Sequence, residues 1–207
     1  MGVPATAQAE LAERCLPIEL LVVDVDGVLT DGVIAVDDHG VETKHFHVRD
    51  GLAYALWHRA GKQAAILSGR RGAAVDRRAA ELKIAHVLQG LEGKAEPFRT
   101  LIAGLDLAPR QVCYVGDDLP DLPVLRAAGL AACPADAAAE VRDAAQFVTR
   151  APGGRGAVRQ VVEVILKAQG KWDGLILDFG LSIFDPGSAP ADQGGNPTIR
   201  NLGPQKA

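Results

Sequence analysis

The chain has 207 residues, of which 48% are hydrophobic and 23% are charged, so it can form the core of a globular domain of ordinary size. Its net charge of -4 and the absence of a basic cluster argue against nucleic acid as a partner, because proteins that bind phosphate backbones carry basic patches. No run approaches the roughly 18 apolar residues of a membrane span, and residues 1–18 lack the apolar core of a signal peptide. We therefore expect a cytoplasmic protein without a membrane partner.

Three cysteines, Cys15, Cys113 and Cys133, are widely spaced and form no C-x-x-C pair. This spacing disfavours both a disulfide framework and a zinc site. Cys113 stands within the apolar run 111–115 and is expected to be a small buried side chain.

Short β-branched runs alternate with helical stretches rich in Ala and Leu, a pattern typical of a parallel sheet with crossover helices. We therefore predict an α/β domain over 19–173, preceded by an N-terminal segment, 1–18. The expected strands are Leu20–Val25, Ala64–Leu67, His86–Leu88, Val112–Val115, Leu130–Ala132 and Gln146–Val148. The expected helices are one through Ala60 with Asp50 as its N-cap, then Ala73–Leu82, Ala95–Leu105, Leu122–Ala128, Ala137–Ala144 and Gly156–Ala168.

Two segments depart from this alternation. Residues 32–36 and 41–46 are strand-like and flank the turn Asp37-Asp38-His39-Gly40, so they predict a β-hairpin directly after the first strand. The hairpin should overhang the carboxyl end of that strand. From 174 to 207 the sequence becomes rich in Gly, Pro, Asn, Gln and Ser, and we expect a mostly disordered tail despite the apolar Leu175-Ile176-Leu177.

The first strand ends in two carboxylates one residue apart, Asp24 and Asp26. Ligands of open α/β sheets bind outside the carboxyl ends of the strands. Two aspartates placed there predict a site for a hard metal ion with a second carboxylate free for chemistry. The alternative is an Asp-Gly turn whose partner carboxylate is solvated.

Three later strands also end in polar residues. Ser68 and Gly69 stand where a strand meets a helix, a place suited to an oxyanion, although an ordinary Ser N-cap would have the same sequence. Lys94 begins a helix, where its charge opposes the helix dipole and suggests a nearby anion. A further cluster of three carboxylates is costly without a cation or a lysine to neutralise it; it comprises Asp117, Asp118 and Asp121.

In chain order these words are D-V-D-G-V-L-T-D-G, S-G-R, a lysine and G-D-D-L-P-D. With these motifs the chain resembles the haloacid dehalogenase superfamily of aspartate-nucleophile phosphohydrolases. The resemblance extends from about Leu20 to Asp173. The longer words F-H-V-R-D-G, V-T-R-A-P-G-G-R-G-A-V-R and A-Q-G-K-W-D resemble the family of 3-deoxy-D-manno-octulosonate 8-phosphate phosphatases within it. The resemblance implies a Rossmann-like fold, dependence on Mg²⁺, a sugar-phosphate substrate and a homotetramer.

The resemblance also assigns roles. Asp24 is implied to attack phosphorus and become an aspartyl-phosphate, while Asp26 gives a proton to the leaving group and later activates water. The implied Mg²⁺ ligands are Asp24, the backbone carbonyl of Asp26 and Asp117. Asp118 and Asp121 are implied to orient water molecules and Lys94. Ser68 and Lys94 would hold the phosphoryl oxygens.

Relatives in the superfamily often insert a cap domain, but the intervals Asp26–Ser68 and Ser68–Lys94 leave no room for one. The hairpin and a neighbouring subunit's Gly153–Arg159 segment are the two candidates to cover the site. Arginine guanidinium groups are suited to a substrate carboxylate. The residues expected to bind substrate are Arg49, Asp50, Gly69, Arg70, Arg78, Arg155 and Arg159.

The chain departs from the family where a second glycine and an isoleucine are usual, because it has Ala53 and Tyr54, and again where Gln160 replaces the usual glutamate. If Ala53 lies where substrate approaches, a 9-carbon keto-sugar phosphate of the sialic acid type is an alternative substrate. A phosphorylatable receiver module is a second alternative, although receivers carry their acid pair before the phosphoacceptor strand. A module that keeps only the fold is a third.

Overall fold

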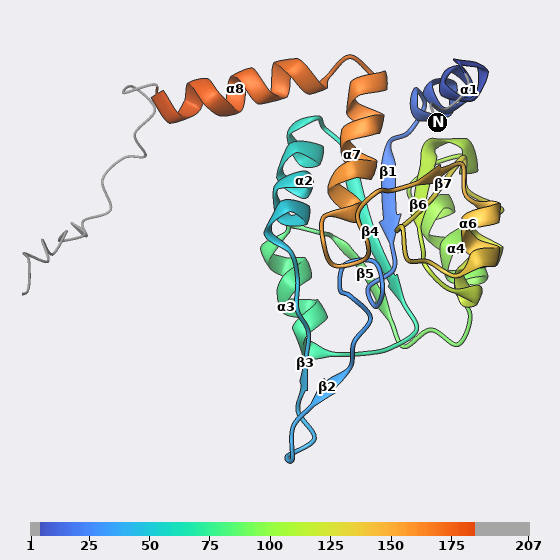
Figure 1. Cartoon of the computed structure of the whole chain (residues 1–207), viewed down its shortest axis with the longest axis vertical. Helices are drawn as coiled ribbons and strands as arrows, with labels where there is room; N and C mark the ends of the chain where they lie inside the picture. Colours follow the sequence, from blue (N-terminus) through green and yellow to red (C-terminus); the bar gives the residue numbers. More distant parts are fainter. Residues whose placement is uncertain (1–4, 185–207) are drawn as a thin grey trace, which may run out of the picture.

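The computed structural model describes residues 5–184 and the side chains of residues 6–178. It is built around one six-stranded parallel sheet with the strand order β5-β4-β1-β6-β7-β8 (Figure 1). The strands are β1 Leu20–Val23, β4 Gln63–Ser68, β5 His86–Gln89, β6 Val112–Val115, β7 Leu130–Cys133 and β8 Phe147–Val148. The prediction of an α/β fold with a parallel sheet is confirmed.

Helices cover both faces of the sheet. They are α1 Ala5–Cys15, α2 Val48–Arg59, α3 Ala73–Glu81, α4 Ala95–Gly104, α5 Leu122–Leu125, α6 Ala139–Ala144, α7 Ala157–Ala168 and α8 Trp172–Phe184, with 3-10 turns at Pro109–Gln111 and Leu119–Asp121. One apolar cluster joins β1 to α2, α3 and α7, and a second joins β1 to α4, α5 and α6. β1 is buried along its whole length because both clusters pack against it.

The strand order reverses beside β1. From β1 the chain moves to β4 and β5 on one side, then returns to β6, β7 and β8 on the other. The carboxyl ends of β1 and β6 therefore lie next to each other at a topological switch point, and Val23 is paired with Val115 there. This is the position where open α/β sheets bind ligands.

The hairpin leaves the same end of the sheet (Figure 1). Its paired strands, β2 Ala35–Val36 and β3 Glu42–Thr43, are shorter than the runs 32–36 and 41–46 that the sequence predicts. Between β1 and β4 the described chain contains only this hairpin and α2, so the prediction that no cap domain interrupts the fold is confirmed.

Two terminal segments differ from expectation. The segment 1–18 contains helix α1, which packs on α7. The expected tail begins with a helix, because α8 runs from Trp172 to Phe184 and extends away from the sheet (Figure 1). The rest of the predicted tail, 185–207, lies outside the described residues. No helix within 5–184 is both long and apolar enough to span a bilayer.

The predicted N-cap of α2 is also wrong. His47 caps this helix, since its ring nitrogen accepts a hydrogen bond from the backbone N–H of Arg49 at 3.2 Å. Asp50 instead lies in the first turn and is buried. An aspartate is favourable both as an N-cap and in the first turn, where its charge interacts well with the helix dipole. The sequence position of Asp50 alone therefore did not distinguish an N-cap from a first-turn residue.

Candidate active site

Asp24 and Asp26 follow β1 at the switch point. The N–H of Asp24 donates to the carbonyl of Val115, which ties the end of β1 to the end of β6 at 2.9 Å. The chain then turns at Gly27, which has a φ of +86°. A Cβ at Gly27 would lie 1.9 Å from the Asp117 carboxylate. Glycine is therefore required here both by its backbone conformation and by the close approach of the second acidic strand end.

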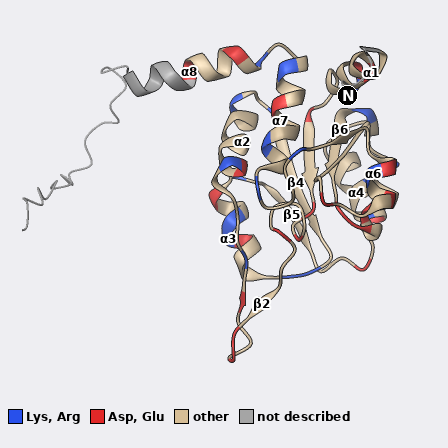
Figure 2. Cartoon of the chain, in the orientation of Figure 1, with Lys and Arg blue, Asp and Glu red and all other residues tan. Residues whose placement is uncertain are grey.

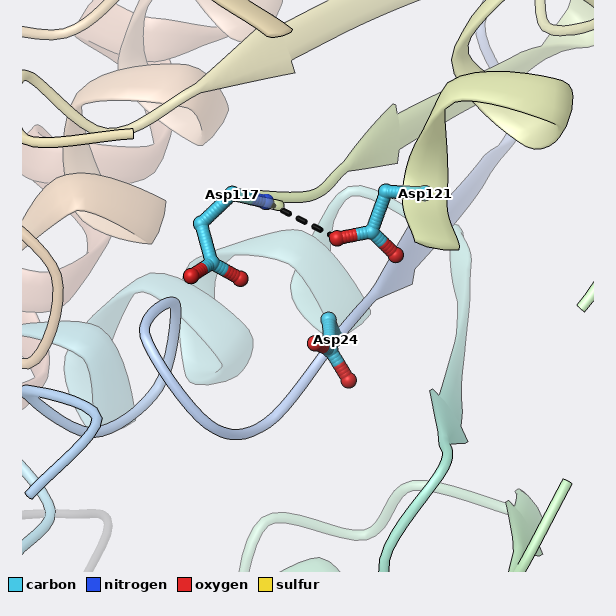
Figure 3. Close-up of side chains that lie close together, drawn as sticks. All are labelled: Asp24, Asp117 and Asp121. Atoms are coloured by element: carbon cyan, nitrogen blue, oxygen red, sulfur yellow. Dashed lines mark hydrogen bonds between the residues drawn. The ribbon is translucent and has the colours of Figure 1, made fainter. Parts of the chain in front are cut away.

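Three carboxylates meet at this point. Asp24, Asp117 and Asp121 each place an oxygen within 4.8 Å of the other two (Figure 3). The backbone N–H of Asp117 donates to Asp121 at 2.9 Å, and that of Asp118 at 3.3 Å. Asp118 itself caps the following 3-10 turn through the N–H of Leu119. The loop after β6 and the 3-10 turn that follows it thus bring Asp117 and Asp121 toward the end of β1.

Lys94 supplies the opposing charge. Its ammonium lies 2.9 Å from Asp24 and 2.7 Å from Asp121, and only 6% of the residue is exposed. The hydroxyl of Tyr114 also donates to Asp121 at 2.5 Å. Both oxygens of Asp121 are therefore occupied by hydrogen bonds, which fits an orienting role for this residue.

Burial and neighbouring charges shift the pKa values of two of these carboxyl groups. Burial raises the pKa of the Asp24 carboxyl to about 6, although Lys94 opposes this. Burial and the neighbouring charges of Asp24 and Asp121 raise the pKa of Asp117 to about 8. Two carboxylates of this kind are held as anions at neutral pH by a cation placed between them.

A magnesium ion fits this set of donors. Mg²⁺ prefers carboxylate oxygens together with water, and the Oδ1 atom of Asp117 is buried without a hydrogen-bond partner. Asp24 and Asp117 would hold the ion, because Asp121 already serves Lys94, Tyr114 and the backbone. The cofactor that the site accommodates is thus Mg²⁺, as the sequence predicts.

A pocket of about 300 Å³ joins these groups to the end of β4 and the loop that follows it. Ser68 is 1% exposed at the end of β4, and Arg70 follows it across Gly69. In Figure 2 the blue, basic segment that follows β4 lies near the red, acidic loops at the same end of the sheet. The pocket brings together these predicted residues: Asp24, Asp26, Ser68, Gly69, Arg70, Lys94, Asp117, Asp118 and Asp121.

Comparison with known proteins agrees with this geometry. No family model matches the chain. The chain is 44% identical over 165 residues to the 3-deoxy-D-manno-octulosonate 8-phosphate phosphatase KdsC of Escherichia coli (strain K12), covering 80% of this chain and 88% of the relative. The chain belongs to the 3-deoxy-D-manno-octulosonate 8-phosphate phosphatase family. It is accordingly a phosphoric monoester hydrolase of the haloacid dehalogenase superfamily.

Solved structures of this phosphatase family have the same fold. The phosphatase of Yersinia pestis is 42% identical, with a TM-score of 0.78, and the match covers 80% of this chain and 89% of that one. The phosphatase of Moraxella catarrhalis, solved with a magnesium ion, a phosphate ion and a KDO molecule, is 40% identical, with a TM-score of 0.81, and the match covers 82% and 98% of the two chains.

Asp50 does not line the pocket of this phosphatase. Its carboxylate is buried and accepts hydrogen bonds from the backbone N–H groups of Gly156 at 3.2 Å and Arg159 at 2.9 Å. It therefore caps the first turn of α7 from within α2, and its contact with a sugar hydroxyl stays a prediction. Ala53 is likewise buried in the core, so this departure from the family does not alter the pocket.

We expect replacement of Asp50 by alanine to destabilise the phosphatase by about 1–2 kcal/mol, because two buried N–H groups of α7 lose their acceptor. Urea unfolding followed by circular dichroism measures the change. The matched control is Asp143→Ala on α6, an exposed aspartate, for which a change within about 0.5 kcal/mol is expected. Equal effects of the two substitutions would contradict the capping role.

Four predicted arginines also lie outside the pocket. Arg49 is exposed on the first turn of α2. Arg78 on α3 contacts Glu81 at 2.8 Å and the Phe46 ring, so it braces the base of the hairpin. Arg159 packs over the Trp172 ring at 4.8 Å. Arg155 is 65% exposed, with Asp31 at 3.9 Å.

The Gly153–Arg159 segment does not begin as a free arm for a neighbouring subunit. A Cβ at Gly153 would lie 1.9 Å from the carbonyl oxygen of Gly27, and the N–H of Gly154 donates to Val28 at 3.0 Å. These glycines pack under the turn that follows Asp26 in the same chain. The segment is therefore anchored in its own chain at its glycines, and of its arginines only Arg155 is largely exposed. Its entry into an adjacent site stays a prediction.

Sequence reasoning missed three residues at the site. Tyr114 is buried beside Asp121, and a buried phenol requires a partner of this kind. From the hairpin, Lys44 contacts Asp26, and Glu42 contacts Lys44. In the strand-like run 41–46 that the sequence predicts, Glu42, Lys44 and Phe46 alternate and would share one face, a signal that the sequence contained.

Proposed function

We propose that this phosphatase hydrolyses 3-deoxy-D-manno-octulosonate 8-phosphate through an aspartyl-phosphate on Asp24, releasing the keto sugar acid and inorganic phosphate. The observation that carries the proposal is the meeting of Asp24, Asp117 and Lys94 in one small pocket at the switch point. The Moraxella relative, whose structure contains magnesium, phosphate and KDO, supports the choice of substrate.

In the first step, a carboxylate oxygen of Asp24 attacks phosphorus and the bond between phosphorus and the sugar oxygen breaks. Asp26 donates its proton to the departing alkoxide. In the second step, Asp26 removes a proton from water, the water oxygen attacks phosphorus, and the bond to Asp24 breaks. Asp26 thereby regains its proton, Asp24 becomes a free carboxylate, and phosphate leaves.

Lys94 and Ser68 would hold phosphoryl oxygens during both steps, since both are buried in the pocket wall. Their fixed positions stabilise charge that develops in the transition state without reorganisation of water. Asp24 and Asp117 would hold Mg²⁺, which would supply positive charge beside the phosphoryl group.

A panel of keto-sugar phosphates tests the substrate. We expect kcat/KM to be highest for the 8-carbon substrate and lower for a 9-carbon keto-sugar 9-phosphate, with both activities lost after treatment with EDTA and restored by Mg²⁺. An Asp24→Ala preparation serves as the control for contaminating phosphatase. A preference for the 9-carbon substrate would support the alternative assignment to sialic-acid-type phosphates, and absence of turnover would support a non-catalytic module.

We further propose a homotetramer assembled through the hairpin. Four of its apolar side chains are more than half exposed: Val33 at 68%, Ile34 at 51%, Val36 at 57% and Val41 at 59%. Apolar patches of this kind on a projecting hairpin favour burial against symmetry-related copies. Light scattering should give the mass of four chains, and Val36→Glu should lower it; a monomeric wild type would contradict the proposal.

We place the phosphatase in the cytoplasm. Its three cysteines are free, buried thiols, as is usual for proteins that fold in a reducing compartment. Fractionation of cells that express the chain tests this placement.

A further inference from the structure

Four charged side chains form a closed ring at the base of the hairpin. The Lys44 ammonium contacts a carboxylate oxygen of Asp26 and lies 2.8 Å from Glu42. Arg70 completes the ring, with Nη2 at 2.5 Å from Glu42 and Nε at 3.8 Å from Asp26. Two cations and two anions therefore connect the hairpin, the end of β1 and the loop after β4.

Burial differs strongly within the ring. The Lys44 side chain is 4% exposed, that of Asp26 is 21% exposed and that of Arg70 is 47% exposed. Solvent screens exposed ion pairs, so the contact of Lys44 with Asp26 should constrain Asp26 more strongly than Arg70 does. Glu42 lies two residues before Lys44, and its carboxylate contacts both the Lys44 ammonium and the Arg70 guanidinium.

The two oxygens of Asp26 are in different environments. Oδ1 accepts a hydrogen bond from Lys44, whereas Oδ2 is buried and accepts none. A carboxyl that is to transfer a proton must keep one oxygen within hydrogen-bond reach of the leaving group. A cation attached to the other oxygen fixes the carboxyl plane and leaves the second oxygen available.

We propose that Lys44 is a positioning residue for Asp26, so that the hairpin sets the geometry of proton transfer to the leaving group. This inference rests on the acid role of Asp26 in the proposed function. Lys44 need not touch the substrate in order to act, because its contact is with the oxygen of Asp26 that does not carry the transferred proton. Glu42 supports Lys44 in this role.

Leaving-group dependence tests the proposal without a sugar. A series of aryl phosphates from p-nitrophenyl phosphate to phenyl phosphate increases the basicity of the leaving oxygen, and only the more basic members need a proton. We expect Lys44→Met to lower kcat/KM for phenyl phosphate about 10- to 100-fold, part of the range for general acid catalysis, but that for p-nitrophenyl phosphate less than about 3-fold. Lys44→Arg should restore most of the loss, and Glu42→Gln should show the same trend more weakly.

The control is His45→Ala, the exposed residue next to Lys44 in the chain, which should leave the whole series unchanged. In an Asp26→Asn background, Lys44→Met should have little further effect, because a residue that acts through Asp26 loses its function with it. A uniform loss across the series would make Lys44 a general attractor of phosphate and overturn the inference. If Asp26→Asn itself shows no leaving-group dependence, the acid role of Asp26 fails; if it shows one and Lys44→Met does not, only the positioning role fails.

Discussion

Replacing Asp24 by alanine is expected to lower kcat about 10³-fold or more while the protein remains folded, because the phosphoryl group then has no acceptor. Asp24 stands at the end of the central strand, 8% exposed and in contact with Lys94. No other carboxylate of the cluster is equivalent to it, since Asp121 is occupied by hydrogen bonds and Asp117 follows a different strand. Steady-state hydrolysis of p-nitrophenyl phosphate with saturating Mg²⁺ measures the effect.

The matched control for this experiment is Asp118→Ala. Asp118 lines the same pocket, but its side chain caps a 3-10 turn, so a much milder loss is expected. Circular dichroism should show that both variants keep the helical content of the wild type. Near-wild-type turnover by Asp24→Ala would refute the covalent mechanism, and trapping of a phosphorylated protein in the wild type alone would support it directly.

Replacing Asp117 by asparagine is expected to weaken Mg²⁺ binding strongly, since one of the few protein ligands loses its charge. Calorimetric titration measures the affinity, and excess Mg²⁺ should recover part of the rate. Asp118→Asn is the matched control, because its side chain serves the backbone. Unchanged affinity in the Asp117 variant would assign the ligand role to another residue.

Although Asp117→Asn should weaken Mg²⁺ binding, it should stabilise the metal-free protein. The pKa of Asp117 is raised from 3.8 to about 8 by burial and by neighbouring carboxylates. The folded state therefore binds more protons than the unfolded state between about pH 4 and pH 8, so stability falls as the pH rises through this window. At pH 8 without metal, Asp117→Asn should accordingly have a higher Tm than the wild type, and added Mg²⁺ should remove the difference. A lower Tm for the variant under metal-free conditions would contradict this account.

The acidic centre could be predicted from the sequence because its signals are local. A buried apolar run that ends in a carboxylate identifies a strand end, and parallel strands bring all their carboxyl ends to one edge. Asp24, Ser68 and Asp117 each stand at or just after the end of a buried run, and the structure brings them into one pocket with Lys94. The parallel sheet and the lack of a cap follow from spacing along the chain in the same way.

The partners of the more distant residues could not be predicted in this way. Asp50 caps a helix more than a hundred residues away, and Gly153 packs under the turn at Gly27. A buried carboxylate that caps a backbone and a carboxylate that binds a sugar have the same sequence signature. Only the packing of α2 against α7 distinguishes them, because it determines which N–H groups lie within reach.

The sequence by itself thus determined the succession of strands and helices along the chain, the carboxyl-end placement of the reactive groups and the preference for a hard metal ion. These depend on hydrophobic periodicity and on the chemistry of single residues, which are properties of short segments. The tertiary structure alone decided that Tyr114 donates to Asp121, that Lys44 of the hairpin holds Asp26, and that the glycine loop belongs to its own chain. Each of these depends on distances between segments far apart in the sequence, and such distances are set only when the layers pack.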